Sequence, residues 1–380
     1  HPRIEVRLFN PFTLRRPKLL SYGFDFFRLN RRMHNKSLTA DGAMSIVGGR
    51  NIGDVYFAFG EGVQYIDTDV LVTGAVAAQI GADFGRYWAS RSAYPAERIL
   101  PEPDARALAK LTADAGAAAR STEGQLYAER LQQSDIVTGM ASHGAGFEWT
   151  NVTLVSDDPA KGLGRAEVND LLFPQLMQLL ARPARSVDLV SAYFVPGRRF
   201  TDALAELAQS GTRVRILTNS QEATDVIVVH SAYVKYRPEL LRSGVELYEL
   251  KPAFAAEPEG ERTGPAGSSR ASLHSKTMAV DEKRIFIGSF NFDPRSFALN
   301  TEMGVLIESP RMARGLANAF SRAFPVASYR PVLAGEDKTL VWEETVADGA
   351  VVRHDEEPGS NPLSRLLLSL LGVLPIEWLL

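Results

Sequence analysis

Apolar and polar positions change in regular blocks along the second half of the chain. Helical patterns cover residues 166–181, 200–210 and 231–243, and each is followed by a short, largely apolar strand pattern at 187–194, 213–217 and 245–250. Parallel strands need crossover connections of this kind, which are usually helices. This half is therefore expected to be α/β, with a mainly parallel sheet.

In the first half, helix and strand patterns alternate less regularly. Strand patterns at 4–9 and 65–72 precede an Ala-rich stretch at 104–133, which predicts a helix interrupted near Gly116. A turn-rich link at 156–164 separates the halves. A polar stretch at 254–269, rich in Glu, Gly and Pro, is expected to be a surface loop.

One motif occurs in both halves. It contains a histidine, a lysine two residues later, and then an aspartate, a glycine and an asparagine. The first copy consists of His34, Lys36, Asp41, Gly48 and Asn51, and the second of His274, Lys276, Asp281, Gly288 and Asn291. Each of the five residues in the second copy lies 240 positions after its counterpart in the first, as His274 does after His34. A single copy is weak evidence, but two copies in one register indicate an internal repeat that carries chemistry.

Each copy is expected to lie on a β-hairpin. Short apolar runs at 38–40 and 45–47 flank Asp41, and runs at 277–280 and 284–287 flank Asp281. Residues two apart on a strand share a face, so the histidine and lysine of each copy point the same way. Asp41 and Asp281 stay among the candidate catalytic residues, but a structural role is expected because Asp readily bonds turn backbone.

Composition narrows the possible functions. The chain has 380 residues, 45% of them hydrophobic, which is enough for one large or two medium cores. It has no cysteine, which excludes disulfides, thiolate metal sites and a cysteine nucleophile. Its net charge of -3 argues against a nucleic-acid partner. No apolar run reaches the roughly 18–20 residues that span a bilayer.

The repeated pattern resembles that of the phospholipase D superfamily, over nearly the whole chain. Within it the chain is most similar to bacterial cardiolipin synthases, and closest to their C type. The stretches that carry this narrower resemblance are 31–37, 47–54, 292–296 and 374–380. The resemblance implies an α/β fold of two pseudo-twofold-related lobes, each a mixed sheet flanked by helices, with the active site at their interface.

Three segments are expected: a first phospholipase D-like domain at 1–157, a second at 158–335 and a C-terminal extension at 336–380. The pattern at 4–9 corresponds to 245–248, so roughly sixty residues of the first domain are expected upstream of His1. The Leu-rich stretch 363–380 is either a membrane-interfacial segment or a helix packed on the core. A basic cluster that includes Arg15, Arg16 and Lys18 either meets anionic headgroups or forms a solvated face.

The resemblance also implies a mechanism. Lys36 and Lys276 would neutralise a phosphodiester without a metal or cofactor. His34 would attack phosphorus to form a phosphohistidine, and His274 would act as acid and then base. The sequence by itself leaves open which histidine is the nucleophile.

Supporting side chains are expected around this core. Each imidazole needs a carboxylate to fix its tautomer, and Glu302 and Asp67 are the candidates, with Asp69 as second choice. Candidates to orient the phosphate are Asn51, Ser289 and Asn291. Gly49 stands where the second copy has Ser289, so one hydroxyl donor is missing.

The implied function is cardiolipin synthesis by phosphatidyl transfer to phosphatidylglycerol, from phosphatidylethanolamine or phosphatidylglycerol. The expected partners are these phospholipids and the membrane surface, with no nucleic acid. The expected location is the bacterial inner membrane, peripheral or anchored by a segment outside this chain. Three alternatives stay open. The chain could be a hydrolytic phospholipase D, another phosphodiesterase such as a nuclease, or an inactive lipid-binding module.

Overall fold

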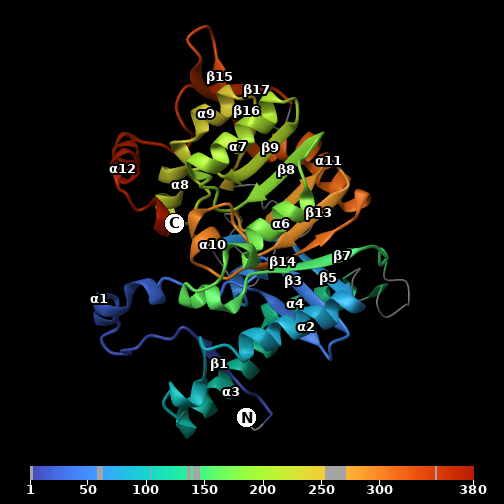
Figure 1. Cartoon of the computed structure of the whole chain (residues 1–380), viewed down its shortest axis with the longest axis vertical. Helices are drawn as coiled ribbons and strands as arrows, with labels where there is room; N and C mark the ends of the chain where they lie inside the picture. Colours follow the sequence, from blue (N-terminus) through green and yellow to red (C-terminus); the bar gives the residue numbers. More distant parts are fainter. Residues whose placement is uncertain are drawn as a thin grey trace.

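A ten-stranded sheet dominates the computed structural model, which describes residues 3–57, 63–102, 104–134, 138–139, 146–252, 271–346 and 349–380 (Figure 1). The predicted loop at 254–269 lies outside the described residues. The strand order is β17-β16-β15-β10-β9-β8-β12-β13-β14-β7. The strands are β7 (Val152–Ser156), β8 (Ser186–Ser191), β9 (Arg213–Asn219), β10 (Glu246–Leu250), β12 (Lys276–Val280), β13 (Arg284–Gly288), β14 (Met303–Ile307), β15 (Ser328–Ala334), β16 (Thr339–Thr345) and β17 (Val351–His354).

The centre of this sheet is parallel, as the alternating pattern predicts. β8 pairs with β9 and β9 with β10 in parallel, through the helices α7 (Gly197–Gln209), α8 (Ile227–Val234) and α9 (Arg237–Arg242). Leu189 and Ile216 pack with α6 (Leu172–Leu180) and α7, while Val190 and Leu217 pack with α11 (Pro310–Ala327) on the other face. Both faces are covered, which explains why these strands are apolar without alternation.

Two helix predictions need correction. The 104–133 stretch forms α3 (Ala105–Arg120) and α4 (Thr122–Gln133), and the break lies at Ser121 rather than near Gly116. The Ser121 side chain accepts from the N–H of Gly124 and caps α4, whereas a glycine is tolerated inside a helix. The 231–243 stretch is divided between α8 and α9, and Pro238 lies in the first turn of the second helix.

The first half builds a smaller sheet of β2 (Ser37–Ala40), β3 (Met44–Gly48) and β5 (Asp69–Thr73), covered by α2 (Ala75–Trp88). Its other described elements are β1 (Arg7–Phe9), which pairs with β6 (Ala93–Pro95), and α1 (Lys18–Leu29). β12 lies between β13 and β8, whereas β2 pairs within the described residues with β3 alone.

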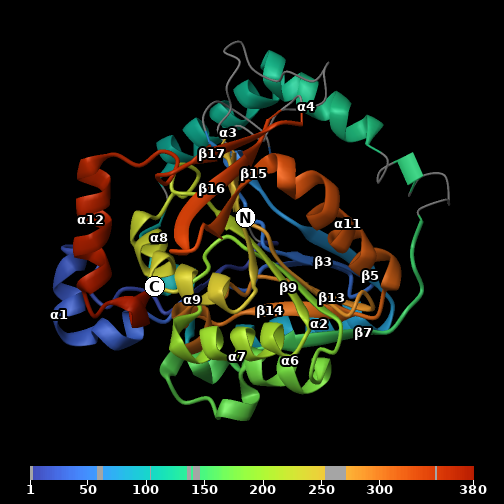
Figure 2. The same cartoon turned by 90° about the horizontal axis from the view of Figure 1, so that it is seen from above.

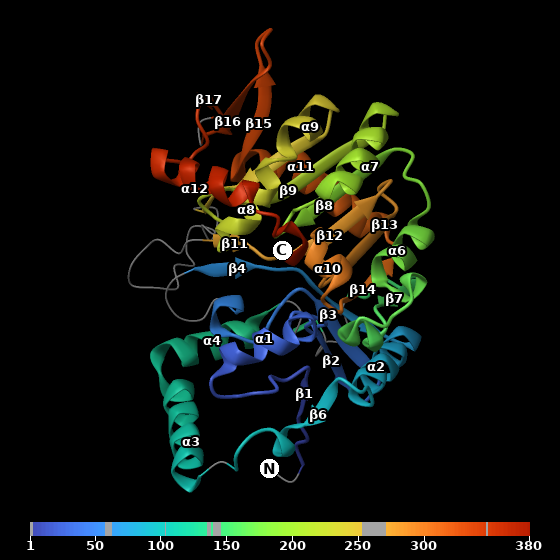
Figure 3. The same cartoon turned by 60° about the vertical axis from the view of Figure 1, so that its left-hand side comes forward.

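The two halves share a core and a strand pairing. Val47 and Val72 of the first half pack against Ile287 and Val305 of the second. Between the halves, β4 (Gln64–Ile66) pairs in parallel with β11 (Ala271–Leu273), as Figure 3 shows. These contacts fix how the two motif hairpins face each other.

The C-terminal segment continues the large sheet. β16 and β17 extend it, and α12 (Pro362–Val373) and the short helix η6 (Glu377–Leu379) follow. The predicted boundary after residue 335 falls between the paired strands β15 and β16, and β7 of the predicted first domain pairs with β14. The division into three domains stays a prediction. Within the described ranges, no helix has the length and apolar character needed to cross a bilayer.

Candidate active site

Each motif histidine is bonded to a carboxylate from the other half of the chain. His34 Nδ1 lies 2.8 Å from Glu302 Oε2, and His274 Nδ1 lies 2.6 Å from Asp67 Oδ2. Both carboxylates are fully buried. These bonds occupy Nδ1, so Nε2 of each ring is the nitrogen that can act on a substrate.

The same backbone pairing positions both histidines. The N–H of His34 donates to the carbonyl of Thr301 at 2.9 Å, and the N–H of His274 donates to the carbonyl of Ile66 at 2.8 Å. Thr301 directly precedes Glu302, and Ile66 directly precedes Asp67. A single strand-to-strand contact therefore places each ring beside its carboxylate.

The two lysines lie close to the histidines, with Lys276 buried and Lys36 partly buried. Lys36 Nζ donates to the carbonyl of His34 at 2.8 Å, and Lys276 Nζ donates to that of His274. Burial lowers the pKa of each lysine to about 8, although the two carboxylates oppose the shift. Each lysine also lowers the pKa of the histidine in the other half. Neither lysine forms an ion pair with a carboxylate of the described residues, and cations shielded from water in this way suit an anionic ligand.

The histidines are arranged to be neutral in the free site. Burial is the main cause that lowers the pKa of both His34 and His274, against the opposing effect of their carboxylates. Burial raises the pKa of Glu302, but His34, Lys36 and Ser289 outweigh it and the pKa falls below its ordinary value. An ionised Glu302 therefore faces a neutral ring, which is the form that can attack.

The surroundings of the two rings differ. The His34 side chain is 24% exposed and that of His274 only 5%. Ring centroids of Tyr56, Tyr65 and Tyr193 lie 5.0, 5.4 and 6.4 Å from that of His274. Among the described residues, no aromatic ring packs against the ring of His34.

An acidic group completes this tyrosine cluster. The hydroxyl of Tyr65 donates to Asp225 at 2.9 Å, and that of Tyr193 donates to the same carboxylate at 2.8 Å. No lysine or arginine of the described residues forms an ion pair with Asp225. Sequence reasoning missed these residues because they come from separate segments without a shared pattern.

Ser289 supports a carboxylate. Its hydroxyl donates to Glu302 Oε2 at 2.6 Å and accepts from the N–H of Met303 at 3.1 Å. At the matching position, a Cβ on Gly49 would lie 2.3 Å from Asp67 Oδ1. Asp67 is one methylene shorter than Glu302, and its carboxylate occupies the space that a side chain at position 49 would need. The first motif therefore has a glycine where the second has Ser289, because Asp67 is placed differently from Glu302.

The two predicted asparagines differ in their contacts. Asn51 Nδ2 donates to the hydroxyl of Tyr56 at 2.7 Å, which ties it to the cluster around His274. Asn291 is buried, and its Oδ1 has no hydrogen-bond partner among the described residues. Asn291 is thus the candidate whose polar atom stays free for a ligand.

The motif aspartates lie at the hairpin turns, as expected. Asp281 has a φ of 56° and accepts hydrogen bonds from the N–H groups of residues 184–186. Asp41 occupies the equivalent turn with a φ of 51°. Asp69, the second choice for a histidine partner, instead pairs with Arg50 at 2.5 Å.

Further buried groups hold Glu302. Ser296 Oγ donates to Glu302 Oε1 at 2.9 Å, and the N–H of Glu302 donates to Asp157 Oδ2 at 2.8 Å. Lys161 pairs with Asp157 at 2.8 Å. Burial raises the pKa of Asp157 to about 6 despite this pair. None of these three partners was predicted, since they lie outside both motifs.

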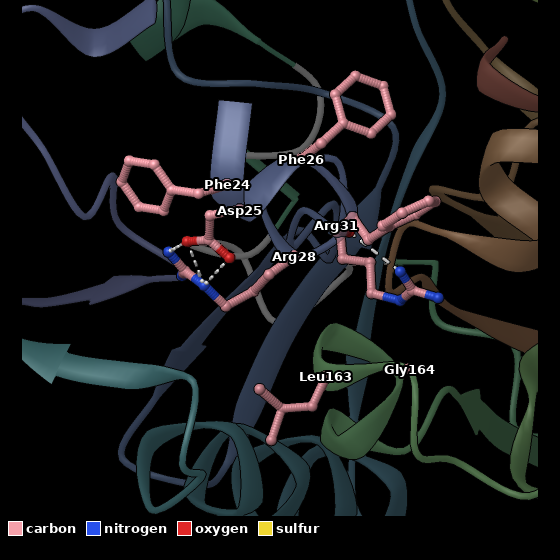
Figure 4. A pocket seen from close by; sticks show the side chains of 8 residues that line it. Phe24, Asp25, Phe26, Arg28, Arg31, Leu163 and Gly164 are labelled. Carbon is pink, nitrogen blue, oxygen red and sulfur yellow. Dashed lines mark hydrogen bonds and ion pairs between the residues drawn. The ribbon is translucent and has the colours of Figure 1, made fainter. Parts of the chain in front are cut away.

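A separate cavity of about 400 Å³ lies at α1 (Figure 4). Phe24, Arg31 and Gly164 are among the residues that line it, and neither motif contributes a histidine or lysine. Inside it, Arg28 is bound to Asp25 (Figure 4). Among the residues described, no group of three or more His, Asp or Glu side chains is arranged to hold a metal ion.

Known proteins resemble this chain in sequence and fold. A family model described as "Cardiolipin synthase, PLD-like domain" matches residues 176–324. The chain is 41% identical to cardiolipin synthase C of Escherichia coli K12, over 100% of this chain and 80% of that protein. It is 26% identical to cardiolipin synthase 1 of a Staphylococcus epidermidis strain, over 78% of this chain and 48% of that protein.

One solved structure supports the fold. The phosphatidylserine synthase of Haemophilus influenzae matches with a TM-score of 0.52 and 14% identity, over 92% of this chain and 71% of that one. At this identity the likeness concerns fold alone. It confirms the predicted fold class.

Proposed function

Since this chain belongs to the cardiolipin synthase family of the phospholipase D superfamily, we propose that it transfers a phosphatidyl group to a hydroxyl of phosphatidylglycerol. Members of this family are phosphatidyltransferases, and this chain is an enzyme of that class. The observation that carries the finer proposal is the crossed pairing of His34 with Glu302 and of His274 with Asp67. It supports one shared site for the two imidazoles and for Lys36 and Lys276, because each lysine affects the pKa of the histidine in the other half.

In the first step, Nε2 of neutral His34 attacks the phosphorus of the donor lipid. The bond between phosphorus and the headgroup oxygen breaks, and protonated His274 gives its Nε2 proton to the leaving alkoxide. Lys36 and Lys276 bind the non-bridging oxygens. The anionic diester raises the pKa of His274, which burial lowers in the free site.

In the second step, neutral His274 accepts a proton from a hydroxyl of phosphatidylglycerol. The resulting oxygen nucleophile attacks phosphorus, the bond to His34 breaks, and cardiolipin is released. Glu302 stabilises the positive charge on His34 while the phosphohistidine exists, since its carboxylate accepts a hydrogen bond from Nδ1–H.

The cluster around His274 supports phosphatidylethanolamine as the donor. His274 protonates the leaving group, so the headgroup alcohol departs beside Tyr56, Tyr65 and Tyr193. Aromatic faces and the carboxyl group of Asp225 favour an ammonium group over a neutral glycerol. Phosphatidylglycerol is the second possible donor.

The test is product analysis with vesicles of phosphatidylethanolamine and isotopically labelled phosphatidylglycerol. The proposal expects labelled cardiolipin and free ethanolamine in equal amounts. Phosphatidic acid as the main product would establish hydrolysis instead, and cleavage of DNA without lipid turnover would establish a nuclease. Asp225→Asn should raise the KM for phosphatidylethanolamine roughly tenfold, while turnover with phosphatidylglycerol as sole donor stays unchanged.

We further propose that the enzyme works at the bacterial inner membrane, where both lipids are found. Its family supports an association with membranes. The acceptor phosphatidylglycerol is itself a bilayer lipid, so both substrates would reach the site from one surface.

A further inference from the structure

Two helices expose apolar faces to solvent on one side of the molecule. Figures 1 and 2 both place α1 and α12 on the left-hand side. In α12, Leu363, Leu366, Leu370 and Val373 are 75, 57, 60 and 82% exposed, and of the residues in this helix only Leu368 is buried. Their spacing of three or four residues puts them on one face. An apolar helix face normally turns inward, and this one turns outward.

The helix α1 has the same property. Leu19, Leu20, Phe24 and Phe27 are 81, 59, 62 and 68% exposed, while Ser21 and Leu29 are buried. Contiguous exposed apolar residues of this kind mark an interaction site.

The chain holds these two faces together. Trp378 of η6, 46% exposed, stacks on Phe27 of α1 with ring centroids 6.4 Å apart. Arg295 joins the chain end to the residue after α1: its backbone N–H donates to the carbonyl of Leu380, its Nε to that of Leu379 at 2.8 Å, and its Nη1 to that of Asn30 at 3.1 Å. The faces of α1 and α12 with Trp378 are called the α1–α12 surface below.

Basic residues border this surface. Arg15, Arg16 and Lys18 are exposed at the start of α1. In the part of the chain that the structure describes, none of the three forms an ion pair. Their charge is therefore available to an anionic partner.

We propose that the α1–α12 surface docks on an anionic phospholipid bilayer. Its leucines, phenylalanines and Trp378 enter the boundary between headgroups and acyl chains, and Arg15, Arg16 and Lys18 bind lipid phosphates. The choice of a bilayer rests on the proposed function, which places both substrates in a membrane. Outward leucines, an interfacial tryptophan and a basic border together fit that partner.

The α1–α12 surface is linked to the candidate active site by neighbouring residues. Asn30 follows α1 directly, and His34 lies four residues further along. Arg295, which bonds Asn30 and the chain end, is next to Ser296, whose hydroxyl donates to Glu302. The surface and the site are thus connected through one short helix, α10 (Pro294–Ala298).

The test is sedimentation with vesicles of phosphatidylcholine, with and without phosphatidylglycerol. The Leu366→Glu/Leu370→Glu and Phe24→Glu/Phe27→Glu variants should each lower the partition coefficient at least about tenfold. The Arg15→Ala/Arg16→Ala/Lys18→Ala variant should lose only the extra binding that phosphatidylglycerol provides. Leu126→Glu/Leu131→Glu in α4 is the matched control, with 49 and 52% exposure on another side, and should bind like the parent.

Separate readouts distinguish docking from catalysis. The docking variants should still cleave a water-soluble nitrophenyl phosphodiester at the parent rate, and His34→Asn should bind vesicles normally without turnover. Parent-like vesicle binding by both apolar variants would overturn the proposal. So would a loss of self-association in sedimentation velocity without any change in vesicle binding. A parent that binds vesicles but makes no cardiolipin would instead contradict the proposed function.

Discussion

Glu302 and His34 are 268 positions apart in the chain, yet their side chains meet at 2.8 Å across the junction of the two halves. His274 and Asp67 make the reciprocal contact at 2.6 Å. Neither half therefore contains a complete histidine–carboxylate pair. Each motif depends on the other half for the group that fixes its tautomer, so the halves are expected to be inactive when separated.

The crossed pairing predicts different effects for the two carboxylates. Glu302→Gln impairs the proposed nucleophile His34, so phosphohistidine formation should slow by roughly 10²–10⁴ with any leaving group. Asp67→Asn impairs the acid, so a nitrophenyl substrate should react nearly normally while a natural lipid donor reacts slowly. Burst kinetics with both substrates measure this. Equal loss with the nitrophenyl substrate in both variants would contradict the assignment.

The pH profile of kcat/KM should fall as pH rises through about 8. Burial lowers the pKa of Lys36 and Lys276 to about 8, so above that value the free enzyme loses the charges that neutralise a phosphodiester. Bound substrate raises both pKa values, and kcat should therefore hold to higher pH than kcat/KM. Initial rates from pH 6 to 10 would test this. A flat kcat/KM profile up to pH 10 would count against the lysines.

Lys276 should also cost stability in the free enzyme. Its folded pKa of about 8 is below its ordinary value of 10.5, so the unfolded chain binds more protons between these values and stability rises with pH there. At pH 7 the full cost is present. Lys276→Met should therefore stabilise the protein by about 1–3 kcal/mol at pH 7 and abolish turnover. Urea unfolding at pH 7 and 9 measures both effects, and a less stable variant at pH 7 would refute the prediction.

The aspartate of the second motif should matter for folding rather than chemistry. Asp281 accepts from the N–H groups of residues 184–186, at the entry to β8 and away from the histidines. Asp281→Ala leaves these donors without their acceptor and should lower the free energy of unfolding by about 1–3 kcal/mol. Turnover of the nitrophenyl substrate by folded protein should stay within twofold of the parent. A large fall in kcat at unchanged stability would assign Asp281 to catalysis.

Local features of the site could be predicted because they depend on short spacing. A histidine and a lysine two residues apart on a strand share a face, and the hairpins form where the turn aspartates predict them. The pairing of each histidine with a carboxylate from the other half could not be predicted from the repeat. The 240-residue spacing between the two copies does not continue beyond the asparagines. Glu302 follows Asn291 by eleven residues, whereas Asp67 follows Asn51 by sixteen.

The other site features that the sequence did not predict depend on contacts between distant segments. Tyr65 and Tyr193 meet at Asp225 only because β4 is paired beside β11, a long-range contact that no local pattern encodes. The role of Gly49 likewise follows from the position of Asp67, whose carboxylate fills the space beside it. The alternation of helices and strands in the second half was visible because burial on both faces leaves continuous apolar runs.

The two histidines can be separated by trapping the intermediate. If His34 is the nucleophile, His274→Asn should still become covalently modified by a nitrophenyl phosphodiester lipid analogue. A good leaving group needs no acid, and the second step lacks its base, so the phosphatidyl-enzyme accumulates. His34→Asn should gain no mass with any leaving group. Intact-protein mass spectrometry of both variants and the parent measures this. A gain in His34→Asn but not in His274→Asn would reverse the roles, and a gain in neither would argue against covalent catalysis.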